Sequence, residues 1–212
     1  IDAVRDVHLE LSSECNAACP RCPRNVAGYP YNDGYTEHSM SLAQAQTIFA
    51  PAFLAQLHSI KINGNFGDIV MNRAAIDIIA YFRTHGQPEL TIEISTNGGA
   101  RDAAFWTALA KLNTTVYFCL DGLADTHSKY RRGTVYSTVL RNARTYIAAG
   151  GRAVWKMIEF DHNLHQRATA QKLASELGFA YFNLVDHGRH SGPVYDKTGQ
   201  LVDILGSAEP IS

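Results

Sequence analysis

The sequence lacks the features that mark a membrane protein or a nucleic-acid binder. No run approaches the ~18 consecutive apolar residues that a membrane-spanning helix needs. An excess of one charge is also missing, because 19 Lys and Arg stand against 20 Asp and Glu. Such a balance gives no electrostatic footprint for a nucleic-acid duplex or an anionic membrane. We therefore expect a small or neutral partner and neither duplex nor membrane.

Phosphate-binding motifs and a disulfide framework are missing as well. Neither a G-x-G-x-x-G nor a Walker pattern occurs, which argues against a phosphate-handling barrel. Only four cysteines occur in 212 residues, and three of them fall within eight residues. This spacing indicates metal ligation in a reducing compartment rather than disulfides. The N-terminal segment has no basic region followed by an apolar run, so we expect a cytoplasmic protein.

What the chain does contain is a regular alternation of strand-like and helical segments. Hydrophobic residues make up 46% of it, enough for a full core. Repeated strand–helix units imply a parallel sheet with right-handed crossovers. The fold class is therefore α/β, and the Gly- and Pro-richer segment 192–212 is expected to be a C-terminal tail or linker. Strands are predicted at 5–11, 59–63, 90–95, 115–120, 153–159 and 179–185, and helices at 41–58, 72–85, 101–112, 137–149 and 164–177.

Each unusual polar or glycine-rich cluster follows the C-terminal end of a predicted strand. In barrels and open parallel sheets, ligands bind at that edge. Because six separate loops agree, we expect one functional site there. The clusters are CNAACPRCPR (15–24), NGNFGD (63–68), STNGG (95–99), LDGL (120–123), EFDHN (159–163) and VDHGRH (185–190).

The first cluster holds a C-x3-C-x2-C pattern made by Cys15, Cys19 and Cys22. Soft thiolates select zinc, copper(I) or iron–sulfur clusters, and three close ligands suit a cube with one iron lacking a protein thiolate. A zinc site with His8 or His38 as fourth ligand is the alternative, although structural zinc usually shows paired spacings. Unligated thiols are a third interpretation.

With the ordered motifs behind the cysteines, the sequence resembles the radical-SAM superfamily. The resemblance implies a partial (β/α)6 TIM-like barrel, with residues 1–191 as the radical SAM core domain. It also implies a [4Fe–4S] cluster, S-adenosylmethionine (SAM) bound to the fourth iron, and an external electron donor such as flavodoxin or ferredoxin. Reductive cleavage of SAM would give a 5′-deoxyadenosyl radical that abstracts hydrogen from a substrate. The match comprises the cysteine motif, Asn63–Asp68, Ser95–Gly98 and Leu120–Gly122, and covers roughly Val7 to Arg189.

The resemblance assigns SAM to the loops after the second and third strands. Gly64 and Gly67 permit close backbone approach, and Asp68 stands where the family's Gly-Gly-Glu-type motif receives the SAM ammonium. The third loop offers hydroxyl and amide groups suited to a ribose or a carboxylate, with helix capping as the alternative role. These residues are Ser95, Thr96 and Asn97.

The fourth strand and the basic turn after it complete the SAM site implied by the resemblance. Asp121 is suited to accept from ribose or to orient substrate. Arg131 or Arg132 of the KYRRG turn is suited to pair with the SAM carboxylate, and we assign Arg132 to this role. A solvated basic turn is the alternative. Cys119, where the family often has Ser, is expected to be buried and inert.

The fifth and sixth strands end in the residues expected nearest the substrate. Glu159, His187 and Arg189 are the candidate catalytic residues, because a His–Arg cluster can bind an anionic group or transfer protons. Surface histidines are also common in polar loops. The basic turn resembles the peptide-modifying branch of the superfamily most, although no cysteine follows Cys119 to form that branch's frequent C-terminal extension. The substrate is thus a peptide, a nucleoside-like molecule or a small metabolite. A non-catalytic zinc or iron–sulfur binding module is the alternative function.

Overall fold

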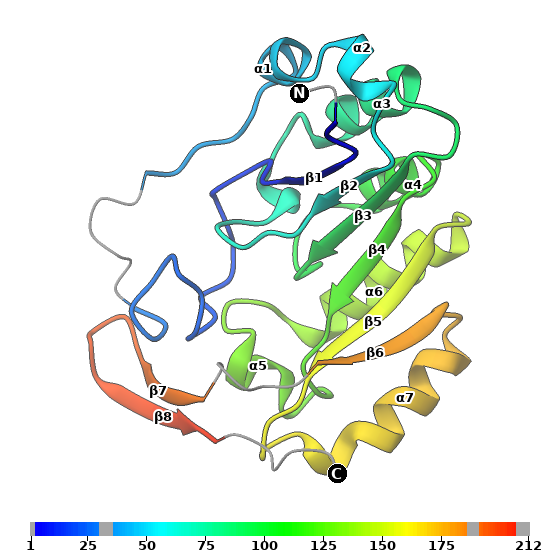
Figure 1. Cartoon of the computed structure of the whole chain (residues 1–212). Coiled ribbons are helices and arrows are strands. Elements are labelled where there is room, and N and C mark those ends of the chain that lie inside the picture. Colours follow the sequence, from blue (N-terminus) through cyan, green and yellow to red (C-terminus); the bar gives the residue numbers. More distant parts are fainter. Residues whose placement is uncertain (1–2, 30–35, 186–190, 207–212) are drawn as a thin grey trace.

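The computed structural model describes residues 3–29, 36–185 and 191–206, and its centre is one six-stranded sheet. Neighbouring strands pair in parallel, in the order β1-β2-β3-β4-β5-β6, which leaves β1 and β6 as edges (Figure 1). The predicted α/β fold, a partial (β/α)6 barrel, is therefore confirmed, with a sheet that does not close. The strands are β1 Asp6–Leu9, β2 Ser59–Ile62, β3 Thr91–Thr96, β4 Thr115–Cys119, β5 Arg152–Ile158 and β6 Tyr181–Val185.

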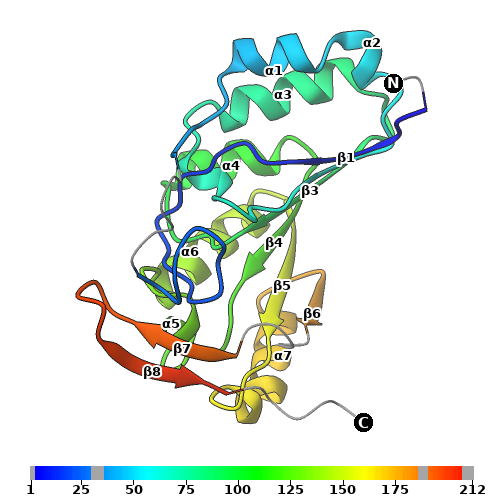
Figure 2. The ribbon, with the colours of Figure 1, turned by 60° about the vertical axis from the view of Figure 1, so that its left-hand side comes forward.

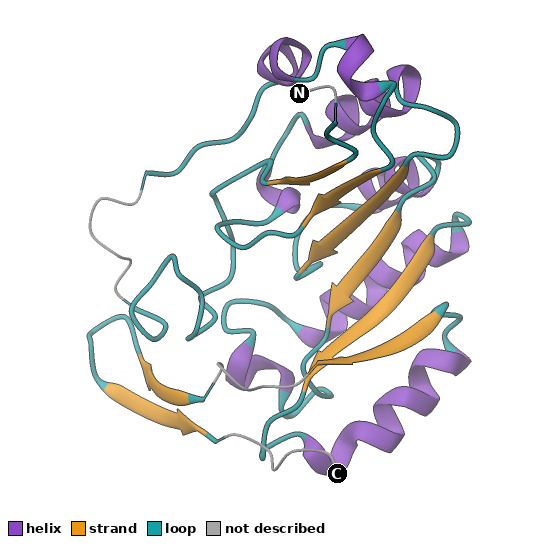
Figure 3. Ribbon diagram, viewed as in Figure 1, coloured by secondary structure: helices purple, strands orange, loops and turns teal. Residues whose placement is uncertain are grey.

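The helices connect successive strands, and most of them pack against one face of this sheet (Figures 1 and 3). The short helix His127–Tyr130 differs, because Tyr130 belongs to a second apolar cluster beside the first loop. Among the described residues, no helix combines the length and the apolarity that crossing a membrane requires. The α-helices are α1 Leu42–Ile48, α2 Pro51–Leu54, α3 Ala75–His85, α4 Ala103–Ala110, α5 His127–Tyr130, α6 Tyr136–Ala148 and α7 Arg167–Glu176, with short 3-10 turns η1 at Ile69–Met71 and η2 at Leu164–Gln166.

Side-chain alternation along the strands separates an apolar face from a mixed, polar one. In β5, Trp155 and Met157 are fully buried in the core between sheet and helices. Successive residues of a strand point to opposite faces, so Lys156 and Ile158 lie on the concave face. The helix side therefore supplies the core, and the concave face is free to line a site.

The predicted helix 41–58 is two helices, which corrects the sequence interpretation. α1 ends at Ile48 and α2 begins at Pro51. Proline has no backbone N–H to donate and disfavours helical geometry in the residue before it. Ala50 accordingly has φ −55° and ψ 149°, and the chain turns there.

The segment expected to be a tail or linker contains an antiparallel hairpin, β7 Gly192–Tyr195 and β8 Leu201–Leu205. Val194 and Leu205 are buried in a second apolar cluster beside the cysteine loop, and the Tyr195 N–H donates to the Ala27 carbonyl at 2.9 Å. Figure 2 shows the hairpin alongside the first loop. The domain boundary at 191/192 stays a prediction, but residues 192–206 pack against the preceding chain.

Candidate active site

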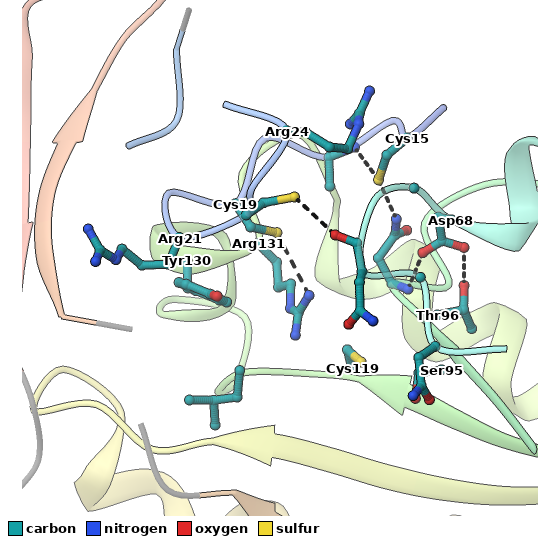
Figure 4. Close-up of a pocket in the computed structure, with 18 of the residues that line it drawn as sticks. Cys15, Cys19, Arg21, Arg24, Asp68, Ser95, Thr96, Cys119, Tyr130 and Arg131 are labelled. Carbon is teal, nitrogen blue, oxygen red and sulfur yellow. Dashed lines mark hydrogen bonds between the residues drawn. The ribbon is translucent and has the colours of Figure 1, made fainter. Parts of the chain in front are cut away.

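A pocket of about 910 Å³, including its open mouth, lies at the C-terminal edge of the sheet. The first, second and third loops meet there (Figure 4), as the positions of the polar clusters predicted. Nine predicted site residues line it: Cys15, Cys19, Cys22, Gly64, Gly67, Asp68, Ser95, Thr96 and Asn97.

The three cysteines are free thiols on the loop between β1 and α1. A turn closes between two of them, because the Cys22 N–H donates to the Cys19 carbonyl at 3.0 Å. The Ala18 N–H donates to the Arg132 carbonyl at 2.8 Å, which ties this loop to the basic turn after β4. Within the described part of the chain, no three His, Cys, Asp or Glu side chains converge as they would around a single metal ion.

Burial dominates the electrostatics of these thiols. It raises the pKa of Cys15 to about 12 and that of Cys19 to about 11, and it also raises the pKa of Cys22. Arg131 opposes this effect at Cys19, and Arg24 opposes it at Cys15 and Cys22. Without a bound cation the thiols stay protonated at neutral pH, so metal binding must release their protons.

The cysteine sulfurs accept hydrogen bonds from three different donors. The Ala17 N–H and the Asn97 amide lie 3.3 and 3.4 Å from the Cys15 sulfur, and the Arg131 guanidinium lies 3.7 Å from the Cys19 sulfur (Figure 4). Donors of this kind stabilise thiolate ligands and tune iron–sulfur centres. The donor set around the thiols therefore fits a [4Fe–4S] cluster.

Asp68 links the second loop to the third. One carboxylate oxygen accepts from the Val70 N–H at 3.1 Å and the Thr96 hydroxyl at 2.6 Å, and the other accepts from the Asn97 N–H at 2.7 Å. Burial raises its pKa, and these hydrogen bonds oppose that rise. A carboxylate has about four acceptor positions, so Asp68 retains little capacity for a further donor.

Gly67 allows the second loop to approach the first. A Cβ on Gly67 would lie 2.0 Å from the Ser12 carbonyl oxygen, so no side chain fits there. The sequence predicted that this glycine admits a ligand, but the structure shows that it admits the backbone of the cysteine loop. Both predicted glycines line the pocket.

Asp121 does not line the pocket, contrary to the prediction of a ribose or substrate contact. It is fully buried, with one oxygen accepting from the Ile158 N–H at 2.6 Å and the other paired with the Arg131 Nε at 2.5 Å. Arg131 does line the pocket. Asp121 therefore acts on the site through Arg131.

Arg132 and Glu159 also point away from the pocket. The Arg132 guanidinium donates to the Tyr195 carbonyl of the hairpin at 2.8 Å. The Glu159 carboxylate is buried on the helix side, 3.7 Å from the Arg167 Nε. The predicted positions His187 and Arg189 lie outside the described residues, and their roles stay predictions.

Several residues of the pocket wall were not predicted from the sequence. Lys156 enters it from the concave face of β5, and a lone lysine within AVWKMIE was the available signal. Arg24 also lines the pocket, is 1% exposed and donates to Glu37 at 2.9 Å. Its spacing from the cysteines did not indicate that it belongs to the pocket wall. Cys119 lines the pocket although it is buried. An apolar part of the wall comes from Tyr130, Ile158 and Val185.

Solved structures share this fold at low sequence identity. SuiB from Streptococcus suis bound to S-adenosylmethionine aligns with 84% of this chain and 40% of its own, at 14% identity and TM-score 0.66. The structure of anSMEcpe with bound AdoMet aligns with 91% of this chain and 51% of its own, at 16% identity and TM-score 0.68. Methylornithine synthase (PylB) aligns with 87% of this chain and 54% of its own, at 11% identity and TM-score 0.63. The chain thus spans about half the length of these proteins or less.

No protein-family model and no curated protein matches the chain. At the identities above, the likeness establishes the fold alone, a partial barrel built on an open parallel sheet. Function depends on the groups in the site rather than on the fold.

Proposed function

We propose that this chain is the core of a radical SAM enzyme, holding a [4Fe–4S] cluster on Cys15, Cys19 and Cys22. The observation that carries the proposal is that these thiols open into the same pocket as the glycine loop after β2 and the Ser-Thr-Asn loop after β3. The solved structures with this fold include SAM-bound proteins. When bound, the cluster and SAM supply a 5′-deoxyadenosyl radical through one-electron cleavage.

The chain's own residues bind and orient SAM. The second loop offers main-chain oxygens and the remaining acceptor capacity of Asp68 to the ammonium. The third loop offers the half-exposed Ser95 hydroxyl to ribose or carboxylate. The apolar wall beside β5 and β6 limits access of water to the reacting atoms.

The SAM carboxylate needs a cation other than Arg132, the residue assigned to it from the sequence. Arg132 donates to the hairpin, and Arg131 is paired with Asp121. Lys156 lines the pocket, and no acidic partner of it occurs among the described residues. Lys156 therefore takes the carboxylate, because a half-buried ammonium gains most from a charged hydrogen-bond partner.

A peptide is the proposed substrate class, and the mouth of the pocket supports it. A second groove shares Arg21, Cys22 and Asn65 with the pocket and continues past the exposed side chain of Phe66 to the hairpin. An extended chain in this groove would present one residue to the pocket. Solved structures with this fold include SuiB bound to its precursor peptide and anSMEcpe bound to a peptide. An external one-electron donor such as flavodoxin or ferredoxin completes the reaction.

Anaerobic reconstitution with iron and sulfide, followed by dithionite reduction with SAM, tests this proposal. We expect 5′-deoxyadenosine to accumulate, measured by mass spectrometry. Cys15→Ala, Cys19→Ala and Cys22→Ala should each abolish both the cluster and the product. Cys119→Ala is the matched control and should keep the cluster, because that buried thiol lies on β4 rather than on the cysteine loop.

The alternative function, a non-catalytic zinc or iron–sulfur module, gives a different result in the same experiment. Such a protein would retain zinc, or a cluster that never cleaves SAM. It would also leave the pocket beside the thiols without a purpose, since a structural metal site needs no open position.

A further inference from the structure

Arg131 places a buried positive charge against one cysteine of the site. Its Nη1 lies 3.7 Å from the Cys19 sulfur, and its side chain is 15% exposed. A charge so far removed from water interacts strongly with its neighbours, because the effective dielectric constant is low there. The stability of negative charge on the Cys19 sulfur therefore depends on this guanidinium.

The charge is fixed in place rather than free to move. Asp121 is fully buried, pairs with the Arg131 Nε, and is itself held by the Ile158 N–H at 2.6 Å. The backbone at Arg131 is held as well, because its N–H donates to the His127 carbonyl at 2.9 Å and its carbonyl accepts from Thr134. The Asp121–Arg131 pair is thus a rigid dipole whose positive end faces Cys19.

The donors at Cys15 are of a different kind. Its sulfur accepts from the Ala17 main-chain N–H and from the neutral Asn97 amide. At Cys19 the donor is a cation, whereas Arg24 acts on Cys15 and Cys22 through its charge. The three ligands are therefore electrostatically unequal.

We propose, on the basis of the proposed function, that Arg131 raises the reduction potential of the cluster and that Asp121 limits the rise. One-electron reduction from the 2+ to the 1+ state, by a low-potential donor, adds one negative charge to a group ligated by Cys19. The guanidinium stabilises that charge through its hydrogen bond to the ligand sulfur. Arg131 and Asp121 are positioning residues that make the cluster easier to reduce.

Redox titration of the reconstituted protein, followed by EPR, tests this assignment without measuring turnover. Arg131→Gln should leave about tenfold less reduced cluster at a fixed solution potential, which corresponds to a midpoint about 59 mV lower for one electron. Asp121→Asn should shift the midpoint in the opposite direction, because it removes the opposing negative charge and keeps one acceptor oxygen. A destabilised fold would not produce shifts of opposite sign.

Arg132→Gln is the matched control. It removes the same charge one residue further along, where the side chain faces Tyr195 rather than a cysteine, so the midpoint should stay close to that of the unmodified protein. Iron and sulfide content is measured for every variant. If Arg131→Gln loses the cluster, Arg131→Lys and Asp121→Asn decide the question. Arg131→Lys keeps the positive charge, so its midpoint should stay close to that of the unmodified protein. The midpoint of Asp121→Asn should rise.

Two outcomes would overturn the inference. One is an unchanged midpoint in Arg131→Gln with a full cluster. The other is a midpoint that fails to rise in Asp121→Asn. If the unmodified protein binds no cluster at all, the proposed function fails instead, so the two failures are distinguishable.

Discussion

At the scale of single residues, the direction of a side chain decides its role. Lys156 lies on the concave face of β5 and lines the pocket, whereas Glu159, three positions further on, faces Arg167 on the helix side. Residues an odd number apart along an extended chain point to opposite faces. Position near a strand end is therefore insufficient to place a residue in the site.

Replacing Lys156 tests the carboxylate contact. Lys156→Met should weaken SAM binding about tenfold or more, because a charge-assisted hydrogen bond contributes roughly 1.5–3 kcal/mol. Decarboxylated SAM should bind the variant and the unmodified protein equally well. Calorimetry on the reconstituted protein measures both affinities, with Glu159→Gln as control. Equal losses for both ligands would show that Lys156 does not contact the carboxylate.

His127 makes stability depend on pH. Its imidazole is fully buried, with Nε2 2.9 Å from the Thr134 hydroxyl, and burial lowers its pKa from 6.5 to about 4. Between these values the unfolded chain binds the proton and the folded protein does not, so stability falls as the pH drops from about 6.5 to about 4. The full loss is roughly 3 kcal/mol.

Urea denaturation at several pH values measures this effect. As the pH falls from about 6.5 to about 4, the free energy of unfolding should decline in the unmodified protein. It should decline less in His127→Gln, because glutamine does not titrate. An identical slope in both proteins would rule out His127 as the source.

At the scale of elements, the sequence predicts strands better than connections. All six strands and their parallel order follow from apolar runs and the helices between them. The break at Pro51 was readable from proline chemistry, yet helical periodicity on both sides concealed it. The hairpin β7–β8 was missed because its small and polar residues resemble a linker, although alternation around the DKTG turn was present.

Gly28 tests whether the hairpin is docked on the cysteine loop. This glycine has φ +112°, and a Cβ would lie 2.9 Å from the Tyr195 carbonyl oxygen. Gly28→Ala should therefore push β7 outward and speed hydrogen exchange of the hairpin amides several-fold. Gly199→Ala is the control, because Gly199 also has positive φ (+79°) but nothing within 4 Å. Equal exchange in the two variants would mean that backbone strain alone, not contact with Tyr195, is being measured.

At the scale of the whole molecule, the segments after β1, β2, β3 and β4 converge on one pocket, and residues of the strands β4, β5 and β6 complete its wall. The order of strands predicts which loops meet, and nine of the predicted residues do line the pocket. It does not predict how side chains pair across loops. The hydrogen bonds that Asn97 donates to Asp68 and to Cys15 join residues distant in sequence, so they depend on tertiary packing that no local pattern encodes.

These cross-loop pairs also explain the revised roles. Asp121 and Arg132 carry the residue types that SAM binding calls for, but their polar atoms are engaged by Ile158, Arg131 and Tyr195. Buried polar groups must find such partners, and those partners leave Asp121 and Arg132 outside the pocket.

EPR spectroscopy of the reconstituted, dithionite-reduced protein, with and without SAM, tests the central claim most directly. If the three cysteines hold a [4Fe–4S] cluster with one iron open to SAM, the reduced protein gives a cluster signal whose g values change when SAM is added. A cluster signal that SAM leaves unchanged, or a protein that keeps zinc and forms no cluster, would contradict the account.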